Sequence, residues 1–156
     1  MFERILVCLD GSKLAEQIIP YATEQALQFD SKVTLLQVMS IPSSIAMASV
    51  AGALPQTGDV IEADVQRQEA EIKACLDGVA QYLLEKGIDT ECVTLGPSQP
   101  GETIVKYAQD NSFDLICIAT HGHSGLGRVV FGSVADYVLR KSGLPILVIK
   151  PREIEA

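Results

Sequence analysis

The sequence has no tryptophan, and aromatic residues make up only 5% of its 156 positions. It also lacks long hydrophobic runs: no stretch approaches the roughly 20 apolar residues of a membrane-spanning helix, so we expect no membrane partner. The first apolar run, residues 5–9, is too short for the core of a signal peptide and ends at Asp10. These absences predict a cytoplasmic protein.

Cysteine is scarce and scattered along the chain. No C-x-x-C pair occurs, and no cysteine lies near a histidine-rich cluster, which argues against a structural zinc site. Three of the four lie in apolar runs, where a free buried thiol is common. We expect all four to be reduced core residues: Cys8, Cys75, Cys92 and Cys117.

An excess of positive charge is also missing. Twelve Lys and Arg residues stand against 20 Asp and Glu residues, which gives a net charge of −8 and a pI near 4.7. Such a field repels nucleic acid and anionic membranes, so we expect neither as a partner. A small anion can still bind to a protein of negative net charge, because backbone N–H groups at a helix N-terminus can hold it. The length fits one domain over residues 1–156.

Strand and helix patterns alternate along the chain. Strands are predicted at residues 5–9, 32–39, 90–95, 114–119 and 145–149, and helices at 12–29, 60–86, 101–111 and 133–142. Pro20 should kink the first helix, since it has no N–H for the helical ladder. The segment 40–59 is composed mainly of Ser, Ala, Gly and Pro, with weak periodicity and little charge, and is expected to be a mobile loop that orders over a ligand. The alternation predicts one parallel α/β sheet with helices on both faces.

In an open α/β sheet, ligands bind beyond the carboxyl ends of the strands. Asp10 follows the first strand, and residues 120–133, after the fourth, hold 4 of the 12 glycines, both histidines and Arg128. The predicted helix start at Gly132 and Ser133 offers N–H groups and a hydroxyl to a phosphate, while Asp10 could accept from ribose hydroxyls or help hold a metal. Purely structural roles remain open: a turn at Asp10, a turn glycine at Gly132 and an N-cap at Ser133.

Standard phosphate and nucleophile motifs are incomplete in this loop. The spacing from Gly122 to Gly127 resembles a phosphate-binding loop, but Arg128 and Val129 replace the required Lys and hydroxyl residue. The dinucleotide motif G-x-G-x-x-G is absent, and the nucleophile motif G-x-S-x-G fails at Leu126. These gaps argue against a P-loop enzyme and a serine hydrolase.

The same residues resemble the universal stress protein family of the UspA-like class. The resemblance covers essentially the whole chain and is carried by residues 5–12, 114–122 and 145–150. Nucleotide-binding members have the motif G-x2-G-x9-G-[ST]; Gly122, Gly132 and Ser133 match its last three fixed positions, whereas Ala119 occupies the first. The resemblance implies a single Rossmann-like, adenine nucleotide alpha hydrolase-like sheet of five parallel strands in the order 3-2-1-4-5.

The resemblance also implies roles for individual residues. Asp10 would lie near the ribose and, indirectly, near Mg²⁺ or Mn²⁺, and the backbone of Val38 would meet adenine. The phosphate-binding positions are Gly122, Gly132 and Ser133, followed on the helix by Val134. Ala119 adds a methyl group where the backbone approaches the ligand.

Two further residues of the loop are candidates for contact with phosphate. His121 could donate a hydrogen bond or become cationic beside an anion. Arg128 could clamp a phosphate with two hydrogen bonds, or could simply be a solvated residue at a loop tip.

The resemblance implies a stress-response or regulatory protein that binds ATP or AMP at the ends of the first and fourth strands. No residue stands out as a general base, so activity is expected to be at most that of a slow ATPase. The alternative is a nucleotide-independent dimeric interaction module, which Ala119 favours. In both cases the apolar strand 145–149, if it lies at a sheet edge, predicts a homodimer, with higher oligomers built from it.

Overall fold

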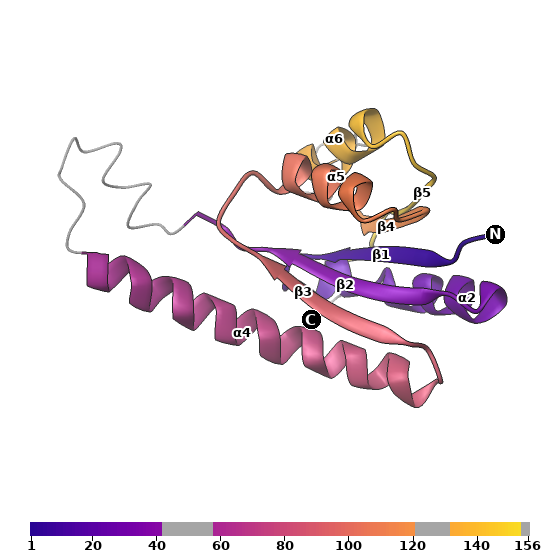
Figure 1. Ribbon diagram of the computed structural model, residues 1–156, viewed down its shortest axis with the longest axis horizontal. Coiled ribbons are helices and arrows are strands. Elements are labelled where there is room, and N and C mark those ends of the chain that lie inside the picture. The colour runs from indigo at the N-terminus through magenta and orange to yellow at the C-terminus, as the bar shows by residue number, and fades with distance from the viewer. Residues whose placement is uncertain (42–57, 121–131, 154–156) are drawn as a thin grey trace.

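The computed structural model describes residues 1–41, 58–120 and 132–153, and its core is a five-stranded parallel sheet (Figure 1). The strand order is β3-β2-β1-β4-β5, which confirms the predicted order 3-2-1-4-5. Most of the segment predicted as a mobile loop, 40–59, lies outside the described residues. The strands are β1 (Arg4–Leu9), β2 (Lys32–Val38), β3 (Thr90–Leu95), β4 (Leu115–Ala119) and β5 (Ile146–Ile149).

Helices cover both faces of the sheet, as predicted. They are α1 (Lys13–Glu16), α2 (Ile19–Phe29), α4 (Gly58–Glu85), α5 (Pro100–Asp110) and α6 (Ser133–Lys141). In Figure 1, α2 and α4 lie on one side of the sheet, and α5 and α6 lie on the other. The five buried residues of β1 alternate between two hydrophobic clusters, one on each face: Ile5 and Val7 belong to the first, Leu6 and Cys8 to the second. This is the burial expected of a central parallel strand.

The segment predicted as one kinked helix is in fact two helices, α1 and α2, separated at Gln17 and Ile18. Pro20 lies in the first turn of α2, where a missing N–H breaks no helical hydrogen bond. The side chain of Gln17 makes two hydrogen bonds to the chain end: its Nε2 donates to the Arg152 carbonyl at 2.8 Å, and its Oε1 accepts from the Arg152 N–H at 2.9 Å. The break is therefore stabilised by a contact between distant parts of the sequence.

The cysteines divide into two groups, and the prediction that all four are core residues is wrong. Cys8 and Cys117 are buried, and desolvation raises the pKa of both thiols, that of Cys117 to about 12. Cys92 is half-buried and Cys75 is exposed. Cys75 lies on α4 directly before the buried Leu76, so the helical period turns its side chain out of the core.

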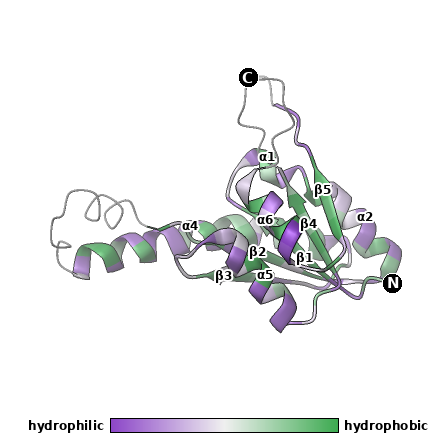
Figure 2. Ribbon diagram, turned by 90° about the horizontal axis from the view of Figure 1, so that it is seen from above, coloured by the Kyte–Doolittle hydropathy of each residue, from purple (hydrophilic) through white to green (hydrophobic). Residues whose placement is uncertain are grey.

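The 28-residue helix α4 is packed over only part of its length. Its buried residues all come from the carboxyl half: Ile72, Leu76, Ala80 and Leu83. Figures 1 and 2 show the first turns extending past the sheet. Among the described residues, no helix combines the length and hydropathy needed to cross a bilayer.

Gly101 permits the close packing of α5 against α6. A Cβ atom at this position would lie 3.0 Å from Cβ and Cγ of Tyr137. Gly101→Ala should therefore lower the free energy of unfolding, measured by urea denaturation, by about 1–3 kcal/mol through overpacking. Gly78→Ala on α4 is the matched control: a Cβ there meets nothing within 4 Å, so we expect a gain of up to about 1 kcal/mol. Equal gains for both variants would contradict the close approach.

Candidate functional site

The turn that follows β1 is held by its own side chains. Oδ1 of Asp10 accepts a hydrogen bond from the Ser12 N–H at 2.9 Å, and Ser12 Oγ accepts from the Ala15 N–H at 3.1 Å as the N-cap of α1. Gly11, between them, has a φ of +84°, which favours glycine. This turn fixes the exposed Asp10 carboxylate at the carboxyl edge of the sheet.

Gln37, near the end of β2, lies beneath this turn. A Cβ atom on Gly11 would lie 3.4 Å from Gln37 Nε2. Gln37 is only 8% exposed, and its Oε1 atom has no hydrogen-bond partner in the described parts of the chain. Gln37 was not among the residues predicted from the sequence. The available signal was a carboxamide side chain among the apolar residues near the end of a strand that is buried on both faces.

The end of β4 is tied to β5. Ala119 pairs with Ile149, and the Thr120 N–H donates to the Ile149 carbonyl at 2.9 Å. The side chain of Ala119 is buried in the hydrophobic cluster that also includes Ala15 and Ile18. Its methyl group therefore contributes to core packing, a role that the motif comparison did not anticipate.

Helix α6 begins with a residue that cannot cap it. Gly132 is the N-cap, with φ −54° and ψ 149°, and has no side chain to accept from the first-turn N–H groups. Ser133, considered above as an N-cap, is instead the first helical residue and is exposed. Val134 is half-buried and packs against the second cluster. This helix start can offer its N–H groups to an anion.

The sequence-predicted residues fall into two sets. The described ones lie at the ends of β1, β2 and β4 or at the start of α6: Asp10, Val38, Ala119, Gly132, Ser133 and Val134. His121, Gly122 and Arg128 lie outside the described residues. Within the described ranges, no three His, Cys, Asp or Glu side chains gather as a metal site, and the metal role of Asp10 stays a prediction.

The described residues fit a nucleotide by their chemistry. An uncapped helix start suits a phosphate. The Asp10 carboxylate suits donors such as ribose hydroxyls. The amide oxygen of Gln37, which has no partner among the described residues, suits one further donor. All three follow or end parallel strands and hence belong to one edge of the sheet.

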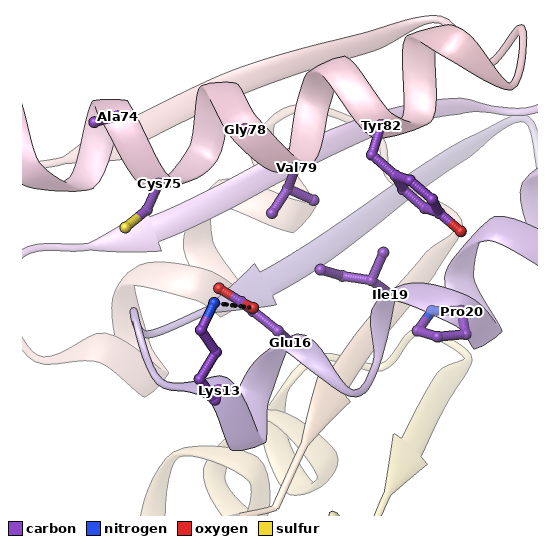
Figure 3. A pocket seen from close by; sticks show the side chains of 9 residues that line it. All are labelled: Lys13, Glu16, Ile19, Pro20, Ala74, Cys75, Gly78, Val79 and Tyr82. Atoms are coloured by element: carbon purple, nitrogen blue, oxygen red, sulfur yellow. Dashed lines mark hydrogen bonds and ion pairs between the residues drawn. The ribbon is translucent and has the colours of Figure 1, made fainter.

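A concavity lies between the α1–α2 segment and α4, outside the turn that holds Asp10 (Figure 3). It has a volume of about 520 Å³. Its polar feature is an ion pair in which Lys13 Nζ lies 3.0 Å from Glu16 Oε2, and this hydrogen bond raises the pKa of Lys13. The lining residues are Lys13, Glu16, Ile19, Pro20, Ala74, Cys75, Gly78, Val79 and Tyr82. None of them has a buried polar atom lacking a partner, so this groove has less binding chemistry than the sheet edge.

Comparison with known proteins places the chain in a family. The profile of the Universal stress protein family matches residues 1–150. The chain is 25% identical to universal stress protein MJ0531 of Methanocaldococcus jannaschii over 150 residues, which cover 96% of this chain and 83% of that one. The solved structure of protein MJ0577 from the same organism has a TM-score of 0.78 at 25% identity and covers 99% of both chains. On this evidence, the chain belongs to the universal stress protein family.

Proposed function

We propose that this universal stress protein binds an adenine nucleotide, ATP or AMP, at the carboxyl ends of β1 and β4 and acts as a nucleotide-dependent regulator in the stress response. The observation that carries the proposal is the start of α6: Gly132 leaves the first-turn N–H groups without a side-chain cap, and Gly132 with Ser133 matches the last two fixed positions of the family's phosphate motif. These groups suit phosphate oxygens.

Each remaining site residue has a distinct role in this proposal. The Asp10 carboxylate accepts from ribose hydroxyls, and the backbone of Val38 contacts the base. Ser133 donates its hydroxyl to a phosphate, while His121 and Arg128 supply further donors. A bound Mg²⁺ or Mn²⁺ would neutralise phosphate charge, with Asp10 near it. No general base is assigned, so the nucleotide acts as a signal and is hydrolysed slowly at most.

Solved relatives support the ligand class. A universal stress protein of Archaeoglobus fulgidus was solved in complex with dAMP, a family member from Arabidopsis thaliana with AMP bound, and another universal stress protein with cAMP. All three contain an adenine base and at least one phosphate. The site chemistry described above suits a phosphate and a base that carries a hydrogen-bond donor.

One alternative function has its own support. Ala119 replaces the first glycine of the nucleotide motif. The four apolar residues of β5, at the edge of the sheet, are only partly buried. Both features favour a dimeric interaction module that works without nucleotide.

A thermal melt with added ligand tests the proposal. Binding to the folded state alone raises the free energy of unfolding by about 2.7 kcal/mol at 100 times Kd, so ATP or AMP should raise the Tm by roughly 5–10 °C. Tripolyphosphate is the control for binding of phosphate alone. If no adenine nucleotide shifts the Tm, and mass spectrometry finds none released from purified, denatured protein, the interaction module replaces the proposed function.

A further inference from the structure

The buried amide of Gln37 needs a hydrogen-bond donor. It belongs to a residue that is 8% exposed, and the described parts of the chain provide no partner for its Oε1 atom. Buried polar atoms without partners are rare in native proteins because each forgoes its hydrogen bonds to water. A ligand group that donates to Oε1 would remove this penalty.

Gln37 adjoins the proposed nucleotide site. It pairs with Leu9, the last residue of β1, and its amide lies against Gly11 in the turn that also holds Asp10. The same turn orients the Asp10 carboxylate through the hydrogen bond from Ser12. A molecule bound beside Asp10 is therefore next to the Gln37 amide.

The strand order gives the direction in which a nucleotide would lie. β1 lies between β4, which precedes the proposed phosphate site at α6, and β2, which carries Gln37. Neighbouring strands are about 4.8 Å apart, so β4 and β2 are separated by about 10 Å. This is comparable with the span of a mononucleotide from phosphate to base. With phosphate at α6 and ribose at Asp10, the base lies toward β2.

We propose that Gln37 determines base specificity: its Oε1 accepts a hydrogen bond from the exocyclic 6-amino group of adenine. In the orientation that the structure shows, with Nε2 toward Gly11, the amide presents Oε1 to the base. A base with a carbonyl at that position would then place an acceptor against an acceptor, so adenine is selected over hypoxanthine and guanine. This inference rests on the proposed nucleotide-binding function. It attributes selectivity between purine bases to one side chain, because the phosphate motif does not contact the base.

The test compares ATP with ITP, which has a 6-carbonyl and an N1–H where ATP has a 6-amino group and an unprotonated N1. Wild-type protein should bind ATP at least tenfold more tightly than ITP by calorimetric titration. Gln37→Met keeps the side-chain length without an acceptor, and it should weaken ATP binding about tenfold, or about 1.4 kcal/mol, while ITP affinity changes less than twofold. The Tm of the ligand-free variant should not fall, because a buried atom without a partner has been removed.

Gln81→Met is the matched control, since Gln81 is exposed on α4 and its Nε2 donates to Glu85 on the same helix. It should leave both affinities unchanged. If wild type binds ATP and Gln37→Met keeps both the affinity and the preference, base recognition by Gln37 is refuted and the proposed function stands. Parallel losses for ATP and ITP with a lower Tm would show a structural role instead, and Gln37→Leu repeats this comparison with a second side chain. If wild type binds neither nucleotide, both proposals fail.

Discussion

Gly122→Val is expected to abolish binding of ATP, so that ATP no longer raises the Tm. Gly122 lies two positions after Thr120, whose N–H is bonded to β5 at the carboxyl edge of the sheet. At the second glycine of the motif, a branched side chain would occupy the volume that we propose for phosphate. The melt of ligand-free protein and its sedimentation should match those of the wild type.

Ser133→Ala should have a smaller effect at the same site. Loss of one hydrogen bond to a charged group weakens binding by roughly ten- to a hundredfold. Because Gly132 is the N-cap of α6, the change removes no capping side chain, and the free protein should keep its stability. Ser133→Thr retains the hydroxyl and is the control. Binding of ATP by both Gly122→Val and Ser133→Ala at wild-type affinity would show that phosphate binds elsewhere.

Val148→Pro is expected to convert a homodimer into a monomer. β5 pairs with β4 on one side, and its four apolar residues are partly exposed. The carbonyls of Pro145 and Ile149 accept hydrogen bonds from the N–H groups of Ile116 and Thr120. Because residues of a strand alternate in direction, the backbone groups of Ile146 and Val148 point the other way, toward the outer edge of the sheet. An edge of this kind is normally paired or covered. Proline at 148 would remove an outward N–H and retain the pairing with β4.

Sedimentation at several concentrations measures this effect. Wild-type protein should have a dimer mass and Val148→Pro a monomer mass. Thr94→Pro is the matched control at the opposite edge: the bonds from Val33 to Asp89 and from Met39 to Leu95 place the backbone of Thr94 outward on β3, and this variant should remain dimeric. A wild-type monomer at every concentration would exclude the β5 dimer, and a dimeric Val148→Pro variant would place the interface elsewhere.

The sequence was sufficient to predict a parallel sheet covered by helices because alternation of short apolar runs with helical periods is a local property. The order of the strands was predicted from the family resemblance. Burial of β1 on both faces followed from its uninterrupted apolar residues. The break between α1 and α2 was not predictable in this way. It involves hydrogen bonds between Gln17 and Arg152, separated by 135 positions, and local periodicity carries no information about such a contact.

The residues of the candidate site likewise include some that local sequence predicts and some that depend on distant neighbours. Asp10, Gly132 and Ser133 were found because they directly follow a predicted strand or begin a predicted helix. Gln37 was not, because the lack of a partner for its Oε1 atom depends on its neighbours across the sheet. The packing of the Ala119 methyl group into the core depends likewise on α1 and the loop before α2.

The uneven packing of α4 implies a gradient of local stability along one helix. Residues 58–64 contribute nothing to the hydrophobic clusters, and the first member that packs there is Val65. An isolated helix shorter than about 12–15 residues is marginal in water. The turns formed by residues 58–64 therefore depend on propagation from the anchored carboxyl half of α4. Fraying should begin at Gly58 and stop between Val65, the first residue to pack against the core, and the buried Ile72. Backbone amides on one continuous helix should therefore exchange with solvent at very different rates.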